Sequence, residues 1–252
     1  MDMYEAIWKR KSIYHYNMEA LDEQMLRNIR AFLDRQILIK EDCKVDYAIL
    51  CQLDQKRPGM NELGVEAPYF MVIYEHELER YYLNAGYLLG QLSLYITSKG
   101  LGSCLVNMSF GKRGKGDKRI IAALAFGKPK TNARLEGHKS KRIPIDYLCV
   151  YKEDVNQDIK KVMKAASVAP SCMNSQPWRF VVYHNRIHIF LKKDRMIKKW
   201  FHSEQMVDMG FMLSNLLMEA ENLWLTTTID YVDNLVEKPV KNYVYILSVV
   251  LE

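Results

Sequence analysis

The chain has 252 residues, of which 49% are hydrophobic and 26% charged, and its formal net charge is +6. This composition is ordinary for a folded protein with one large domain or two small ones, and no apolar run approaches the roughly 20 residues of a membrane span. The five cysteines are an odd number without a CxxC pair, and the N-terminus lacks the apolar region of a signal peptide. We therefore expect reduced thiols, no zinc site and a cytoplasmic location.

Hydrophobic periodicity predicts both helices and strands along the chain. The expected helices cover residues 3–9, 22–36, 79–99, 155–168 and 204–224. The expected strands cover residues 46–52, 68–74, 103–107, 120–126, 179–183, 187–191 and 243–250. The strands on either side of His184-Asn185 are expected to form a hairpin. Together these elements predict an α+β fold with helices packed on a mainly antiparallel sheet.

Two of the expected helices contain similar segments. Residues 84–92 (NAGYLLGQL) and 208–216 (DMGFMLSNL) match in character at nearly every position. Each has small residues four positions apart, namely Gly86, Gly90, Gly210 and Ser214. Small residues at this spacing let two backbones approach closely. The similarity indicates an internal duplication; chance similarity between two core helices is the alternative.

The most distinctive segment is APSCMNSQPW at residues 169–178, at an expected helix-to-strand junction. Pro170 and Pro177 fix their own φ and push the preceding residue toward extended geometry. Between them stand the polar side chains of Ser171, Asn174, Ser175 and Gln176. This pattern predicts hydrogen-bonding groups held for a polar, flat ligand. The alternative is an ordinary helix end and turn, with Trp178 as the first core residue of the next strand.

This segment resembles the APS-x-x-N-x-Q-P-W signature of the FMN-dependent nitroreductase family, and the chain contains further elements of that family. Residues 7–13 (IWKRKSI) resemble its N-terminal motif, whose basic residues and serine hold the FMN phosphate and ribityl chain. Residues 100–104 (GLGSC) resemble a glycine turn whose backbone approaches the flavin ring. Residues 125–129 (AFGKP) resemble the end of a family strand, and residues 141–142 (KR) more weakly resemble a basic pair that closes on the phosphate.

The chain departs from the family pattern in two residues and in the order of its motifs. Tyr14 and Leu105 stand where the family usually has an arginine and an aromatic residue. The QPW motif follows the glycine turn, which fits a chain that fuses the two halves of an ordinary family homodimer. The resemblance therefore implies a nitroreductase-like fold with two pseudo-symmetric, intertwined halves, residues 1–140 and 141–252. It implies one composite FMN site, in a monomer or a weak homodimer.

The resemblance also implies which residues bind the cofactor. Arg10, Lys11 and Ser12 would hold the phosphate and ribityl chain, with Arg142 as a helper. The full set of implied FMN-binding residues is Arg10, Lys11, Ser12, Gly100, Leu101, Gly102, Ser103, Arg142, Pro170, Ser171, Asn174 and Gln176. Cys104 and Cys172 would lie near the flavin. We expect no metal ligand and no indispensable catalytic side chain, because the flavin carries the chemistry.

The implied activity is a ping-pong reaction in which NADH or NADPH reduces the flavin and a nitroaromatic, quinone or similar small molecule takes the electrons. The substitutions at Tyr14 and Leu105 leave open an FMN-binding carrier or sensor, or a degenerate enzyme with little turnover. The basic stretches at 112–118 and 128–142 would also suit an RNA-associated module. No nucleic-acid-binding signature accompanies them. We expect part of this charge to meet the FMN phosphate, with neither a nucleic acid nor a membrane as partner.

Overall fold

The computed structural model describes residues 1–39, 43–53, 65–76, 79–107, 120–130, 141–192, 202–232 and 242–252. The described helices are α1 (Met3–Lys9), α2 (Glu23–Asp34), α3 (Glu79–Ser98), α5 (Ile145–Leu148), α6 (Gln157–Ser167) and α7 (His202–Asn222), with a single 3-10 turn, η2, at Cys172–Asn174. The described strands are β1 (Tyr47–Cys51), β2 (Tyr69–Tyr74), β3 (Gly102–Asn107), β4 (Ile120–Gly127), β5 (Cys149–Tyr151), β6 (Trp178–Val182), β7 (Arg186–Lys192), β8 (Thr227–Asp230) and β9 (Tyr243–Leu251).

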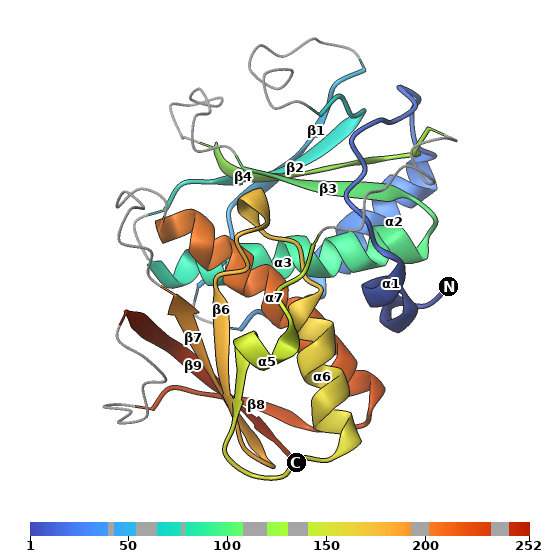
Figure 1. Ribbon diagram of the computed structural model, residues 1–252. Coiled ribbons are helices and arrows are strands. Elements are labelled where there is room, and N and C mark those ends of the chain that lie inside the picture. Colours follow the sequence, from blue (N-terminus) through green and yellow to red (C-terminus); the bar gives the residue numbers. More distant parts are fainter. Residues whose placement is uncertain are drawn as a thin grey trace.

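The strands form two sheets, and α3 and α7 lie between them (Figure 1). One sheet has the order β1-β2-β4-β3, and the other has the order β5-β6-β7-β9-β8. Among the described strand pairs, only β5 and β6 run parallel. The prediction of an α+β fold with mainly antiparallel sheets is therefore confirmed, although the strands form two sheets rather than one.

Each predicted helix and strand is present, with small differences at the ends. The expected hairpin is formed by β6 and β7, in which Val182 pairs with Ile187. The Tyr183 N–H closes the turn by donating to the Arg186 carbonyl over 2.8 Å. The sequence did not predict α5, β5 and β8, which have 4, 3 and 4 residues. Elements of this length do not complete enough of a period to be recognised.

Capping residues explain where two of the helices begin. The Asp2 side chain accepts a hydrogen bond from the Glu5 N–H over 2.7 Å at the start of α1. The Asn156 side chain accepts one from the Ile159 N–H over 2.9 Å at the start of α6. Both satisfy an N–H group that has no partner within the helix. The opposite ends of α1 and α6 lead into the site described below.

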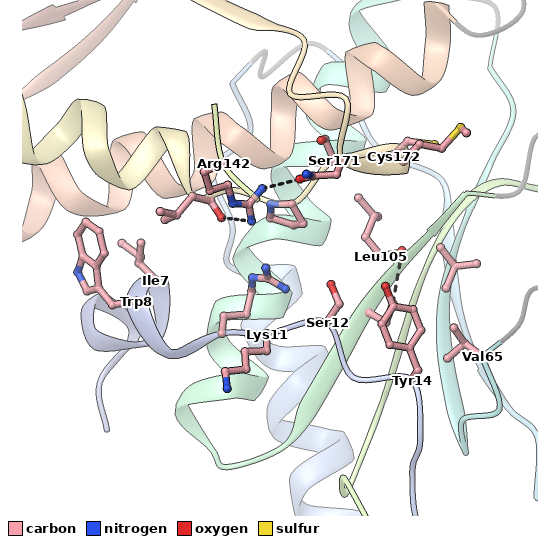
Figure 2. Close-up of a pocket in the computed structure, with 17 residues that line it drawn as sticks. Ile7, Trp8, Lys11, Ser12, Tyr14, Val65, Leu105, Arg142, Ser171 and Cys172 are labelled. Atoms are coloured by element: carbon pink, nitrogen blue, oxygen red, sulfur yellow. Dashed lines mark hydrogen bonds between the residues drawn. The ribbon is translucent and has the colours of Figure 1, made fainter. Parts of the chain in front are cut away.

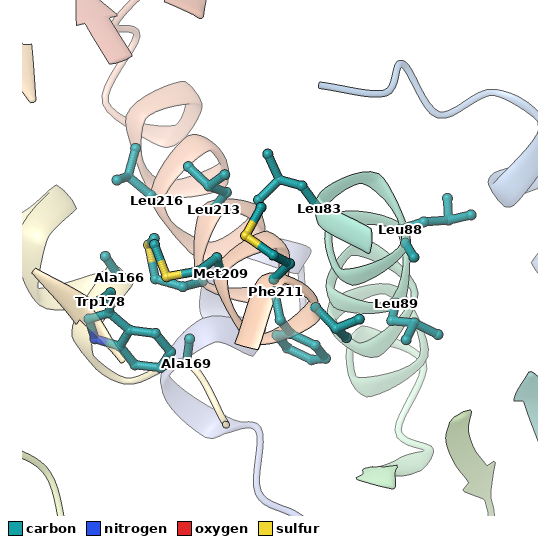
Figure 3. Packing of buried hydrophobic residues seen from close by; sticks show 14 of the residues in the cluster. Leu83, Leu88, Leu89, Ala166, Ala169, Trp178, Met209, Phe211, Leu213 and Leu216 are labelled. Carbon is teal, nitrogen blue, oxygen red and sulfur yellow. The ribbon is translucent and has the colours of Figure 1, made fainter. Parts of the chain in front are cut away.

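The main core runs through both sheets and the helix layer. Alternate residues of the central strands, such as Met71 in β2 and Ile189 in β7, face the helices and are fully buried. Met209 of α7 points toward Ala166 and Trp178, whereas Phe211 points toward α3 (Figure 3). A helix that is apolar around most of its circumference belongs in the middle of a protein. This explains why α3 and α7 form the central layer.

The crossing of α3 and α7 depends on the small residues noted in the sequence. A Cβ atom on Gly86 would overlap the carbonyl oxygen of Val207. A Cβ atom on Gly210 would overlap the carbonyl oxygen of Leu83. Gly86 and Gly210 are separated in sequence by the same number of residues as Leu83 and Val207. The contact is therefore reciprocal, as in an interface with two-fold symmetry.

The ends of these two helices also correspond. The Leu101 N–H donates to the Ile96 carbonyl over 3.0 Å, and the Leu225 N–H donates to the Ala220 carbonyl over 3.0 Å. The residues before them, Gly100 and Trp224, have φ values of 79° and 60°. A strand follows each helix, β3 after α3 and β8 after α7. The order β1-β2-β4-β3 is thus repeated as β6-β7-β9-β8.

Candidate functional site

A cavity of about 610 Å³ lies between the segment that follows α1 and the turn that follows α6. Arg142, Ser171 and Cys172 are on one side of it, and Lys11, Ser12 and Tyr14 on the other (Figure 2). Its lining residues are Ile7, Trp8, Arg10, Lys11, Ser12, Tyr14, Val65, Cys104, Leu105, Val106, Arg142, Val168, Pro170, Ser171, Cys172, Met173 and Asn174. The volume falls within the range of small-molecule and cofactor sites.

The N-terminal wall is held against the edge of the first sheet. Ser12 forms a parallel bridge with Ser103 of β3, and the Ile13 N–H donates to the Ser103 carbonyl over 3.0 Å. Gly102 is needed here, because a Cβ atom would press into the Ile13 side chain. The Ser103 hydroxyl lies 2.7 Å from that of Ser93 in α3. This anchoring brings Arg10, Lys11 and Ser12 to the cavity.

The opposite wall is a turn with unusual backbone geometry. Met173, Asn174 and Gln176 have φ values of 50°, 55° and 47°. Residues other than glycine pay a conformational cost in this region, and such residues cluster at functional sites. The Gln176 N–H donates to the Ser171 hydroxyl over 2.9 Å, which closes the turn. The Ser171 side chain thus ties the two ends of the turn together.

Gln176 and Asn174 also bind the chain segment that carries Arg142. The Gln176 side-chain oxygen accepts from the Ile143 N–H over 2.9 Å, and its nitrogen donates to the Lys141 carbonyl over 3.2 Å. The Asn174 side-chain nitrogen donates to the same carbonyl over 2.7 Å. The polar residues of the QPW motif therefore bond largely to the protein itself, and they fix the position of Arg142.

Arg142 and Arg10 form a concentration of positive charge in the cavity. The Arg142 guanidinium donates to the Asn174 side-chain oxygen over 3.1 Å and to the Val168 carbonyl over 2.8 Å. Burial, and next the Arg142 charge, lower the pKa of Arg10 to about 10. Lys11 adds a third cation, and within the part of the chain that the structure describes none of the lining residues is acidic. The cavity is thus suited to an anion.

Cys104 lies beneath the N-terminal wall and also lines the cavity. Burial raises the pKa of its thiol to about 11, although Arg10 and hydrogen bonds with Ser12 and Tyr14 act in the opposite direction. The thiol is therefore protonated at neutral pH. This environment differs from the electropositive, exposed setting of a reactive cysteine, in which the pKa is lowered.

The structure brings together many, but not all, of the predicted cofactor-binding residues. Those that line the cavity are Arg10, Lys11, Ser12, Arg142, Pro170, Ser171 and Asn174. Gly100, Leu101 and Gly102 instead line a second hollow of about 330 Å³, which shares Lys11 with the cavity. Ser103 and Gln176 are buried and belong to neither lining. Cys104 and Cys172, which were expected near the ligand, both line the cavity.

The sequence analysis did not assign a ligand contact to several lining residues. Trp8, Val106 and Met173 lie within or beside the quoted motifs. The motifs therefore indicated that these residues are near the site, but not that they line it. Val65 carried no signal, because it approaches the site only through the packing of the first sheet. Trp178 is fully buried at the start of β6, as the alternative interpretation of the motif expected. Within the described residues, no helix is long and apolar enough to cross a membrane.

Comparison with known proteins assigns the chain to a family. The family model described as "Putative TM nitroreductase" matches residues 2–220. The chain therefore belongs to this nitroreductase family, which confirms the resemblance drawn from its motifs. No curated protein matches the chain.

Solved structures show the same fold. A structure described as a "putative nitroreductase (tm1586)" from Thermotoga maritima MSB8 has a TM-score of 0.67 at 19% identity, covering 100% of this chain and 93% of its own. A point variant of the FMN and NADPH-dependent nitroreductase NfnB from Sphigopyxis sp. strain HMH has a TM-score of 0.50 at 13% identity, covering 61% of this chain and 100% of its own. The hypothetical oxidoreductase YcnD from Bacillus subtilis has a TM-score of 0.50 at 17% identity, covering 65% of this chain and 79% of its own.

Proposed function

We propose that this nitroreductase-family oxidoreductase uses FMN and passes electrons from NADH or NADPH to small acceptors such as nitroaromatics and quinones. The observation that carries the proposal is the proximity of two cations, Arg10 and Arg142, in a cavity of cofactor size. The described lining residues of this cavity include no acid. The NfnB structure, described as FMN and NADPH-dependent, has the same fold and supports the choice of cofactor and donor.

The residues of the cavity fit the phosphate of FMN. Two neighbouring guanidinium groups repel each other, and this repulsion contributes to the lowered pKa of Arg10. A phosphate monoester carries nearly two negative charges at neutral pH and accepts paired hydrogen bonds from arginine. Binding such a group would replace the repulsion with attraction. This charge arrangement supports a ligand with a doubly charged anionic end.

Each lining element has a proposed role. Arg10, Lys11 and Arg142 bind the phosphate, and Ser12 binds the ribityl chain. Pro170, Ser171 and Asn174 abut the ring system from the opposite wall. When bound, FMN supplies the redox chemistry, because it can accept a hydride from a reduced nicotinamide and return electrons to a second substrate. The lining residues bind and orient the ligands, and we assign none of them as a general acid or base.

We further propose that the chain is a fused pseudo-dimer with halves at residues 1–140 and 141–252. The repeated strand order and the reciprocal contact of α3 with α7 support this interpretation. The match with NfnB covers 100% of NfnB but 61% of this chain, whereas the match with the Thermotoga structure covers 100% of this chain. The cavity takes Arg10 from one half and Arg142 from the other, so a single chain would hold one composite site. We propose a monomer or weak homodimer.

The first experiment is the visible absorption spectrum of the purified protein, with release and quantification of FMN. One FMN per chain supports the composite site, and two per chain would contradict it. Protein that stays free of flavin after FMN is added would refute the proposed cofactor. Anaerobic titration with NADH and NADPH then tests electron transfer: bound flavin that neither donor reduces would favour an FMN carrier or sensor.

The variant Arg10→Ala tests the phosphate site. We expect it to remain folded, with an intact far-UV circular dichroism spectrum, and to bind FMN at least about tenfold more weakly, because a charged hydrogen bond is lost. Unchanged FMN affinity would show that the phosphate binds elsewhere. Lys9→Ala is a suitable control, since Lys9 is a neighbouring exposed cation that pairs with Glu5 and does not line the cavity.

A further inference from the structure

The turn at Cys172–Asn174 combines an unfavourable backbone conformation with an exposed side chain. Met173 and Asn174 are both in the left-handed region, and the Met173 side chain is 88% exposed. An apolar side chain in water contributes little burial to offset the backbone cost. A turn of this kind persists only if the surrounding structure holds it.

That support comes from a buried carboxylate behind the cavity wall. Asp208 of α7 is 1% exposed, and its two oxygens accept from the Cys172 N–H over 2.9 and 3.0 Å. A small hollow beside Asp208 shares Leu105, Val106 and Cys172 with the main cavity. The carboxylate therefore lies directly behind the residues that face the ligand, and it bonds to the start of the strained turn.

Burying the carboxyl group of Asp208 is unfavourable for the stability of the fold. Burial raises its pKa well above the usual value, and the nearby Glu204 acts in the same direction. The hydrogen bonds from the Cys172 N–H and the Ser175 side chain oppose these effects. Burying a carboxyl group costs free energy unless hydrogen bonds compensate for the lost water. Its presence here therefore points to a role in geometry.

The other half of the molecule offers an internal comparison. Asn84 of α3 and Asp208 of α7 have the same sequence separation as Gly86 and Gly210. The Asn84 side-chain nitrogen donates to the carbonyl of Cys43, shortly before β1, over 2.8 Å. Asp208 bonds to Cys172, shortly before β6. The two side chains occupy corresponding positions with opposite polarity, since the amide donates to a carbonyl and the carboxylate accepts from an N–H.

We infer that Asp208 is a positioning residue of the proposed flavin site, which holds the Cys172 backbone so that the Ser171–Asn174 turn faces the ligand. This inference rests on the proposed function. The acceptor oxygens of Asp208 hold this backbone, and Asp208 lies in the same half of the chain as the turn. The Asn84 side chain bonds to the corresponding loop of the other half, and Asn84 is not among the described residues that line the cavity.

The test compares Asp208→Ala with Asp208→Asn in the full chain. Asparagine keeps an oxygen that can accept from the Cys172 N–H, whereas alanine leaves that N–H without its acceptor. We expect Asp208→Ala to raise hydrogen–deuterium exchange at residues 171–175 about tenfold without FMN, and to weaken FMN binding by a similar factor. Asp208→Asn should restore both to within about threefold of the original protein. If Asp208→Ala does not fold, Asp208→Leu fills the volume without an acceptor.

Asn84→Ala is the matched control. It removes a buried polar side chain at the corresponding position, and we expect lower thermal stability with unchanged exchange at residues 171–175 and unchanged FMN affinity. Equal loss of FMN affinity in Asn84→Ala and Asp208→Ala would show a general structural effect and overturn the inference. Unchanged exchange in Asp208→Ala would overturn it as well. Failure of the unaltered protein to bind FMN would instead refute the proposed function, and the exchange measurement would still test whether Asp208 holds the Cys172 backbone.

Discussion

Gly86 and Gly210 occupy reciprocal positions where α3 crosses α7, and each lies against a backbone carbonyl of the other helix. Neither position has room for a Cβ atom. This contact sets how closely the two central helices approach each other. Because the sheets pack on these helices, it also sets how the two sides of the cavity are brought together.

Substitution at this crossing is therefore expected to be costly. Gly86→Ala places a methyl group against the Val207 carbonyl, and we expect a loss of about 3 kcal/mol in the free energy of unfolding, measured by urea titration. At Gly90 the added Cβ would instead meet the Ser214 side chain. Gly90→Ala should cost less, and Gly90→Ala combined with Ser214→Gly should recover most of the loss. A neutral Gly86→Ala variant would contradict the close approach.

The residues that follow α3 and α7 lead to two predictions of opposite sign. Trp224 is 94% exposed with a φ of 60°, in a position that corresponds to Gly100. A non-glycine residue in this conformation costs about 1 kcal/mol. We expect Trp224→Gly to raise the melting temperature and Gly100→Ala to lower it, each by an amount equivalent to about 1 kcal/mol. A lower melting temperature for Trp224→Gly would show that the exposed indole has an unrecognised contact.

The thiol of Cys104 should react slowly at neutral pH. Its pKa is raised to about 11, so only roughly one thousandth of it is thiolate at pH 8. Below the pKa, we expect the rate of alkylation by iodoacetamide, followed for this residue by peptide mass spectrometry, to rise about tenfold per pH unit. Cys104→Ser should retain flavin reduction. Rapid modification at pH 7 would mean that the thiol is less buried than the structure shows.

The charge of Arg10 should oppose folding while it favours ligand binding. Burial and Arg142 lower the pKa of Arg10 from its ordinary value, so the folded protein without ligand binds this proton less tightly than the unfolded chain does. The cost is fully present at neutral pH and is relieved only as the pH rises through about 10. At pH 7, Arg10→Met should therefore be equally or more stable in urea without ligand, yet bind FMN at least about tenfold more weakly. A large loss of stability would show that Arg10 has a structural role.

The QPW motif shows which features of the site depend on the sequence and which on the tertiary structure. Its residues pointed to the family and to a turn that lines the cavity. The sequence could not show that Gln176 turns away from the cavity and bonds to Lys141 and Ile143. Nor could it show that Gly100 and Gly102 line a separate hollow. The sequence showed that Gln176 can form hydrogen bonds and that the glycines are flexible. Which cavity each residue faces depends on segments that are distant in the chain.

The sequence by itself determined the local structure and the chemistry of the motifs. Periodic apolar residues specify α3, α7 and the long strands, because burial follows the repeat of each element. Prolines, glycines and capping residues mark where these elements end. Only the tertiary structure decided that Arg10 meets Arg142 and that Asp208 lies behind Cys172. These pairs are distant in sequence, and their proximity follows from the close crossing of α3 with α7 and from the layers that pack around it.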